Sequence, residues 1–250
     1  MASKDLKLAI NLLQTYGGRD KVMRIISYGS LLLSGLVKSP SKSKKLLTIF
    51  TELSGCRTIL RLFDDLPMLG YSLSYGLGAQ EKSLWLRVLS LANNLIDQLY
   101  FPLEHIAWAA DKKLIDVSSS PWWILCIVAW GLSLSISILR SLMTLVSLRR
   151  SRKKLEQEIQ MEDPCCSSGR QESSVVEGQQ ISRLKEAERA HLLEVLKYAT
   201  DLCNAIHWMP VGFLWGGKLS DATVGFLGTI SSVLYLQAVV RQTQARLAAQ

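Results

Sequence analysis

The strongest constraint on this chain is an apolar run at residues 118–139 that contains no charged side chain. An α-helix rises about 1.5 Å per residue, so about 20 apolar residues cross the hydrocarbon core of a bilayer. Pro121 suits the first turn of such a helix, and Trp122 and Trp123 suit the headgroup layer. A buried helix of a soluble bundle is the alternative, but such helices seldom stay uncharged for so long. The run therefore predicts a first transmembrane segment, placed at residues 118–148.

A second uncharged run at residues 222–240 is also long enough to span a bilayer. Small residues recur within it at a spacing of four, and such pairs let two helices approach closely in lipid. We therefore predict a second transmembrane segment with a short tail at residues 218–250, whose small residues pack against other helices and help the protein to self-associate. The predicted packing positions are Gly225, Gly228, Thr229 and Ser232.

The composition agrees with a membrane protein. Of the 250 residues, 48% are hydrophobic and only 20% are charged, a balance that argues against a disordered chain. The net charge is +8 and basic residues flank the apolar segments, which favours an anionic membrane surface over nucleic acid as the partner. We predict an all-α membrane protein: an N-terminal amphipathic helical region (1–117) and two transmembrane helices joined by a polar linker (149–181), with an amphipathic membrane approach (182–217) before the second.

Glycine and proline residues divide the N-terminal region into helices. Gly17 and Gly18 are expected to separate a helix at residues 5–15 from a second helix that continues to about residue 37. A third helix is expected at residues 42–66, because Pro67 ends or kinks a helix. Three glycines then predict a loop or loose helix up to residue 80, followed by a helix from residue 81 to residue 110 that contains Pro102.

The helix expected at residues 42–66 carries an apolar stripe along one side and a cluster of lysines at its start. Each basic residue near an anionic surface contributes about 1 kcal/mol of attraction. Either the stripe packs inside a helical bundle, or it lies in the headgroup layer and wedges lipids apart; the lysine cluster favours the second alternative. The predicted membrane-inserting residues are Leu46, Ile49, Phe50, Leu53, Leu60 and Phe63, and the predicted headgroup-binding residues are Lys42, Lys44 and Lys45.

Residues 149–181 are rich in Glu, Gln and Ser and contain Pro164, which predicts a poorly ordered linker. Cys165 and Cys166 within it are ordinary loop thiols or, beside a membrane, palmitoylation sites. A basic run directly follows the first apolar segment, and we predict that it forms part of a targeting signal held by a membrane-protein import receptor. A plain stop-transfer anchor is the alternative. The basic residues are Arg149, Arg150, Arg152, Lys153 and Lys154.

The sequence contains no catalytic motif: it has no nucleophile elbow, no phosphate-binding glycine loop and no zinc-protease motif. His105, His191 and His207 have no partners at metal-ligand spacing. We therefore predict no enzymatic activity, no metal and no cofactor. A channel or transporter is the alternative to a non-enzymatic membrane-remodelling protein. A channel or transporter requires a charged residue inside a span, and only Arg140 comes near such a position.

Five blocks of sequence resemble the peroxin-eleven family, and in detail its gamma type. They are RDKVMRIISYG (residues 19–29), CRTILRLFDD (56–65), YGLGAQE (75–81), DQLYFPLEHIAWAAD (97–111) and VGFLGTISSVL (224–234). The blocks occur in order over nearly the whole chain apart from the linker, so the resemblance is specific. It implies a peroxisomal membrane protein that elongates and tubulates the membrane before division, and it maps the family's lipid-remodelling helix onto residues 42–66.

The resemblance also implies partners and a topology. The partners are the protein itself, other family members, and a tail-anchored fission adaptor that recruits a dynamin-like GTPase. Both termini are expected in the cytosol, which with two spans places the basic run at residues 149–154 on the matrix side. The positive-inside rule places the same run in the cytosol. We follow the family topology, because that rule describes insertion at the secretory translocon.

Overall fold

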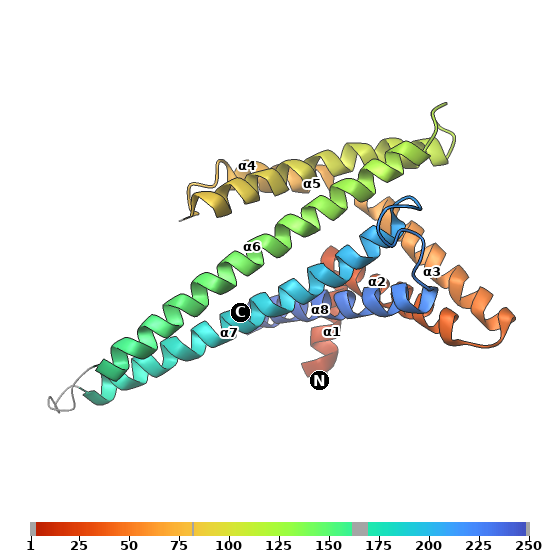
Figure 1. Ribbon diagram of the computed structural model, residues 1–250. Helices are drawn as coiled ribbons and strands as arrows, with labels where there is room; N and C mark the ends of the chain where they lie inside the picture. The colour runs from red at the N-terminus through yellow and green to blue at the C-terminus, as the bar shows by residue number, and fades with distance from the viewer. Residues whose placement is uncertain (1–3, 82, 162–169, 249–250) are drawn as a thin grey trace.

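The computed structural model describes residues 4–81, 83–161 and 170–248, and this part of the chain is all-α, with no strand (Figure 1). Its helices are α1 (Lys4–Gln14), α2 (Tyr16–Leu36), α3 (Pro40–Arg61), α4 (Asp65–Tyr75), α5 (Leu84–Asp111), α6 (Ser120–Met161), α7 (Arg170–Trp208) and α8 (Asp221–Ala248). The all-α class predicted from the sequence is confirmed.

Neighbouring helices run in opposite directions. The helices α6 and α7 form a long hairpin (Figure 1), and the Arg152 guanidinium of α6 binds Glu188 of α7. The next helix, α8, returns along α7, where the Asn204 amide donates a hydrogen bond to the Val224 carbonyl at 3.2 Å. Therefore α6 and α8 run in the same direction, and α7 runs back between them.

The remaining helices add to both sides of this unit. The helix α5 lies along the N-terminal half of α6 and α4 packs on α5, whereas α1 and α2 pack on α8 and α3 packs on α2 (Figure 1). The Trp123 indole of α6 donates a hydrogen bond to Asp111 at the end of α5, so these two helices are also antiparallel. The Arg61 guanidinium of α3 reaches Glu104 of α5 and joins the two groups.

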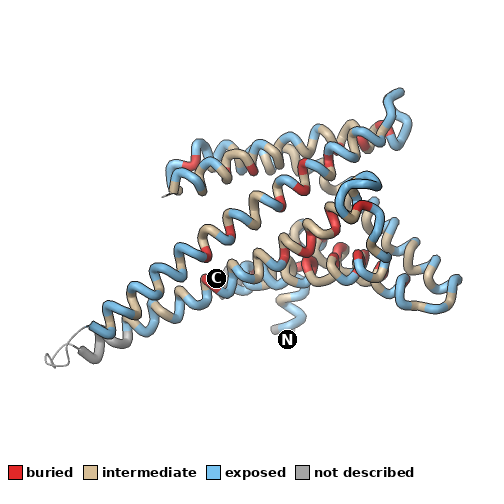
Figure 2. Tube along the Cα trace, viewed as in Figure 1, coloured by how far each residue is buried: buried red, intermediate tan, exposed pale blue. Residues whose placement is uncertain are grey.

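The interior is polar and the surface is apolar. Among the described residues, 17 buried side chains are polar or charged and ten are apolar, and the buried positions form narrow lines along the helices (Figure 2). The helices α6 and α8 are long and apolar enough to cross a membrane, and only 17% and 28% of their apolar windows are buried. This distribution reverses that of a soluble bundle, whose apolar residues face inward. It suits a protein whose solvent is lipid.

The predicted linker at residues 149–181 is largely helical, so the prediction of poor order is wrong for its described part. The helix α6 continues to Met161, and α7 begins at Arg170. Ion pairs one turn apart, such as Arg152 with Glu156, support the extended helix, and the pairs across to α7 hold the hairpin together. Cys165 and Cys166 lie outside the described residues.

Two predicted helix boundaries in the N-terminal region also differ. The helix α2 begins at Tyr16, before the two glycines, because the Thr15 hydroxyl caps it by accepting a hydrogen bond from the Gly18 amide at 3.1 Å. The helix α3 ends at Arg61, and Pro67 lies in the first turn of α4, where its missing N–H costs little. The loop predicted up to residue 80 is therefore partly helical.

Candidate functional site

A cavity of 660 Å³ lies where seven helices meet. Residues of α2, α3, α4, α5, α6, α7 and α8 line it, and most of them are charged or aromatic. The charged residues of its lining are Arg24, Arg57, Arg61, Asp64, Asp97 and Asp201.

One buried ion pair joins α2 to α7. The Arg24 guanidinium donates a hydrogen bond to the Asp201 carboxylate at 2.6 Å and another to the Ser231 hydroxyl of α8 at 3.1 Å. The two charged side chains are 8% and 1% exposed, and the Tyr235 ring lies 4.9 Å from the guanidinium. This pair therefore fixes three helices relative to one another.

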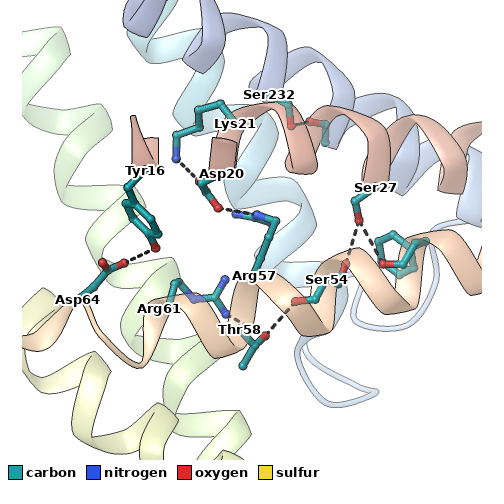
Figure 3. A network of polar contacts seen from close by, with 12 residues as sticks. Tyr16, Asp20, Lys21, Ser27, Ser54, Arg57, Thr58, Arg61, Asp64 and Ser232 are labelled. Carbon is teal, nitrogen blue, oxygen red and sulfur yellow. Dashed lines mark hydrogen bonds and ion pairs between the residues drawn. The ribbon is translucent and has the colours of Figure 1, made fainter. Parts of the chain in front are cut away.

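A second ionic cluster joins α2 to α3 (Figure 3). Asp20 accepts hydrogen bonds from Lys21 and from Arg57, each at 2.7 Å. Burial raises the pKa of Asp20, but the charges and hydrogen bonds of Arg57 and Lys21 outweigh it and lower this pKa to about 2. Asp20 is therefore ionised at neutral pH, and it neutralises the cations around it.

A third pair joins α3 to α5. The Arg61 guanidinium binds both carboxylate oxygens of Glu104, and the Tyr100 hydroxyl donates a hydrogen bond to the same carboxylate at 2.9 Å. The Glu104 side chain is 1% exposed. The three arginines of the cavity thus each pair with one carboxylate, which offsets their charges, while eight aromatic side chains supply much of the remaining lining. Such a lining suits water or a polar solute, and it presents no activated nucleophile.

The predicted stripe of α3 forms only part of its packed face. No residue of α3, which the structure describes completely, is buried. The side that packs on α2 carries polar contacts: Ser43 donates a hydrogen bond to the Ser34 carbonyl, and Ser54 bonds Ser27 at 2.9 Å (Figure 3). Of the stripe, Phe50 lies against Tyr28 of α2, and Leu60 lines a hollow with Leu13 and Val22.

The stripe itself occupies the flank and the outer side of α3. Ile49 and Phe63 are exposed, at 42% and 75%, and the predicted headgroup-binding lysines are all exposed. Phe50 differs, since its ring lies 6.0 Å from the Tyr28 ring and lines the cavity. The half-buried stripe residues are Leu46, Phe50, Leu53 and Leu60, and the exposed lysines are Lys42, Lys44 and Lys45.

The basic run after the first span lies on α6, facing α7 in part. Arg152 binds Glu188 and Glu156, and Arg149 lies 3.8 Å from Glu188. Arg150 and Lys153 are exposed, and so is Lys154, which lies 3.8 Å from Glu158. The run is therefore divided between hairpin contacts and a free basic surface.

The small residues predicted for helix packing bring α8 against α2 of the same chain. A Cβ atom on Gly225 would lie 2.2 Å from the Leu32 nitrogen, and one on Gly228 would lie 2.1 Å from the Tyr28 ring. Ser232 is fully buried beside them, and Thr229 donates a hydrogen bond to the Gly225 carbonyl. Because α2 already covers this face, it is not open to the second copy that the sequence suggested.

Comparison with known proteins places the chain in a family. Residues 6–240 match the family described as Peroxisomal biogenesis factor 11 (PEX11). The chain belongs to this family. The chain is also similar to two proteins named Peroxisomal membrane protein 11C. The one from Homo sapiens is 41% identical over 235 residues and the one from Mus musculus is 37% identical over 234 residues, and each comparison covers 92% of both chains. No solved structure matches the chain.

The ion pairs of this PEX11 protein were missed by the sequence reasoning, which looked for charge only inside α6 and α8. The charged residues lie instead on α2, α3, α5 and α7. A signal was present: Asp20, Arg24, Ser27 and Ser34 recur at helical spacing along one side of an otherwise apolar segment. In lipid, such a polar stripe is the side that packs inward.

Proposed function

We propose that this PEX11 protein, of the gamma type, promotes protrusion, elongation and division of the peroxisomal membrane, and so regulates peroxisome number and size. It does so without enzymatic activity, by inserting the outer side of α3 and α4 into one leaflet and by oligomerising. The observation that supports this most is the surface of these two helices, which hold no buried residue and expose a row of apolar side chains. The exposed apolar side chains of these helices and of the turns directly after them are Ile49, Ile59, Phe63, Leu66, Leu69, Leu73 and Leu77.

The magnitudes favour insertion by this surface. Burying one large apolar side chain contributes about 1.5–3 kcal/mol, so several of them outweigh the roughly 1 kcal/mol that each lysine adds near anionic lipid. The apolar row therefore sets membrane affinity, and the three lysines set the preference for anionic lipids. A shallow wedge in one leaflet enlarges it relative to the other, and this asymmetry curves the membrane.

The test uses the full-length protein in anionic vesicles that are imaged by electron microscopy. The variant Phe63→Asp/Leu66→Asp changes side chains that are 75% and 76% exposed, so the fold is retained while the wedge is lost. We expect tubulation to disappear. The matched control, Thr48→Asp, adds a charge at an exposed position of α3 without an apolar side chain and should tubulate normally. Equal tubulation by both variants would reject the wedge.

Family membership supports the proposed partners: other copies of the protein, other family members, a membrane-protein import receptor, and the fission adaptor with its dynamin-like GTPase. Both termini are proposed to lie in the cytosol in a multi-pass peroxisomal membrane protein. The packing of α1 against α8 supports placing the two ends on one side. Co-precipitation of differently tagged copies from peroxisomal membranes tests self-association, and its absence would remove oligomerisation from the mechanism.

A channel or transporter for polar solutes is the second candidate, and the cavity favours it. The sequence offered no charged residue inside a bundle of apolar helices, whereas the structure has one buried and two partly buried ion pairs around 660 Å³. Leakage of small anions from vesicles that contain the whole protein distinguishes the two functions. Vesicles that tubulate without leaking would contradict the channel function and support membrane remodelling.

A further inference from the structure

We propose that the cavity of 660 Å³ binds a phosphocholine group, the zwitterionic headgroup of a choline phospholipid. The arginine side of the cavity binds the phosphate, and the tryptophan side binds the trimethylammonium. This inference goes beyond both functions proposed above, because it assigns a ligand to the cavity and depends on neither tubulation nor conductance.

The composition of the lining matches that of a small-molecule site. Such sites enclose about 300–1,000 Å³ and combine aromatic side chains with a few polar groups. Of the 17 residues that line this cavity, eight are aromatic, and they come from six helices. A ligand of this cavity therefore needs a surface that suits aromatic rings as well as atoms that bind charged groups. The aromatic lining residues are Tyr28, Phe50, Tyr100, Phe101, Trp123, Trp130, Trp208 and Tyr235.

Hydrogen-bond donors that are not used within the described chain line one side of the cavity. Arg24 is only 7% exposed, yet its Nε atom has no hydrogen-bond partner among the described residues. Arg57 binds Asp20 through its Nε atom alone, so its two terminal nitrogens make no hydrogen bond within the same part of the chain (Figure 3). Buried N–H groups require acceptors, and the oxygens of one phosphate can accept from two guanidinium groups. This side of the cavity therefore suits a phosphate.

Tryptophan rings line the other side of the cavity. Among the described residues, no lysine or arginine lies over the rings of Trp123, Trp130 or Trp208. Tryptophan nevertheless attracts a cation more strongly than the other aromatic side chains do. Trp208 is also 43% exposed, so the cavity reaches the surface at this side and a lipid headgroup can enter there. The tryptophan rings are therefore available to a quaternary ammonium.

A carboxylate accompanies the tryptophans. Asp97 of α5 lies beside Ser133 of α6, and Ser133 follows Trp130 by about one helical turn. Asp97 forms no ion pair with the described residues, in contrast to Asp201, which pairs with Arg24. A cation that leaves water needs a countercharge, and Asp97 can supply it for a trimethylammonium beside Trp130.

The charges of the lining favour a zwitterion over an anion. Each lining arginine is already paired with a carboxylate, and the lining also contains Asp64 and Asp97, so a headgroup with a net negative charge gains little attraction. An ethanolamine headgroup is zwitterionic too, but its ammonium is small and strongly hydrated. A trimethylammonium has no N–H group and is bound by aromatic rings, which this cavity has in excess. Phosphocholine therefore fits better than phosphoethanolamine or phosphoglycerol.

The experiment measures the unfolding temperature of the full-length protein in a maltoside detergent as lipid is added. The lipids are dioleoyl phosphatidylcholine, phosphatidylethanolamine and phosphatidylglycerol, which share their chains and differ in the headgroup; soluble phosphocholine is the fourth probe. We expect phosphatidylcholine to raise the unfolding temperature at the lowest mole fraction. A rise with this lipid alone assigns the site to a membrane lipid, and a rise with soluble phosphocholine as well assigns it to the headgroup whatever its chains. Equal rises with the three lipids, or no rise, would overturn the proposal.

Two pairs of variants locate the binding site. Trp208→Leu removes a lining ring and should weaken the response to phosphatidylcholine about fivefold, whereas Trp85→Leu removes a more exposed ring outside the cavity and should leave the response unchanged. Asp97→Asn should reduce the preference for phosphatidylcholine over phosphatidylglycerol, and Asp116→Asn, at an exposed position outside the cavity, should not. Each response is measured against the same variant without lipid, so a general loss of stability does not imitate the effect. An unchanged response in either cavity variant would overturn the assignment of the ligand to this cavity.

Discussion

The interface of α2, α7 and α8 differs sharply from the outer side of α3 and α4. The first is built from the buried Arg24–Asp201 ion pair, hydroxyls, and glycines that bring helices into backbone contact. The second has no buried residue and exposes large apolar side chains. Both suit lipid, but in different ways, since polar groups fix helix positions inside the bundle while apolar groups remain free for the bilayer. In this protein, therefore, buried polar contacts identify the region where the helices are held in fixed positions.

The largest effect is expected when the Arg24–Asp201 pair of the rigid interface is broken. Arg24→Gln leaves the Asp201 carboxylate buried without a countercharge, which costs about 3–5 kcal/mol. The temperature of thermal unfolding in detergent should fall strongly for this variant. It should fall much less for Arg19→Gln, because Arg19 is exposed on the same helix. The double variant Arg24→Gln/Asp201→Asn should recover most of the loss, and a lack of recovery would show that the pair is not the source of stability.

The backbone contact between α2 and α8 gives the next effect. Gly225→Ala places a Cβ atom 2.2 Å from the Leu32 nitrogen, and we expect a loss of about 1–3 kcal/mol from overpacking. Gly29→Ala on α2 is the matched control, because nothing lies within 4 Å of its Cβ position. It should stabilise the helix slightly. Equal unfolding temperatures for the two variants would contradict close packing at this interface.

Acid should loosen the junction of α2 with α3 by a smaller amount. The pKa of Asp20 lies at about 2 in the folded protein, against 3.8 for the ordinary group. A lowered pKa contributes stability above pH 4 that is lost as the pH falls from about 4 to 2, amounting to at most about 2 kcal/mol. Unfolding followed between pH 5 and pH 2 should therefore show a steeper loss for the native chain than for Asp20→Asn. The same dependence of stability on pH in the two proteins would argue against the ion pair of Asp20 with Arg57.

The smallest effect is expected in the basic run of α6, where the free and paired residues can be separated. Arg150→Ser/Lys153→Ser removes exposed charge and should leave stability unchanged, whereas Arg152→Ser also loses the contact with Glu188 and should lower the unfolding temperature slightly. If the run targets the protein, the double variant should already move it to mitochondria or the cytosol. Normal peroxisomal localisation of the double variant would favour the stop-transfer alternative.

The two helices that are long and apolar enough to span a membrane could be predicted from the sequence, because lack of charge is a local property. The partners of Arg152 and Arg24 could not, since Glu188 lies 36 positions away and Asp201 lies 177 positions away. The stripe of α3 was recognised, but the polar side that packs was not, because the reasoning followed apolar periodicity as in a soluble bundle. The long helical hairpin was taken for a linker because its Glu and Arg residues look like those of a solvated segment. These residues stabilise the hairpin only when α6 and α7 come together and the charges pair across them.

The length of α6 has a mechanical consequence. Beyond the apolar stretch that ends at Leu148, the helix continues to Met161, which extends it by about 20 Å at 1.5 Å per residue. The pairs of Arg149 and Arg152 with Glu188 fasten this extension to α7, so it behaves as a two-helix arm and not as a flexible tether. A molecule bound at the end of the arm is therefore held by two helices, and a pull on it is shared between α6 and α7.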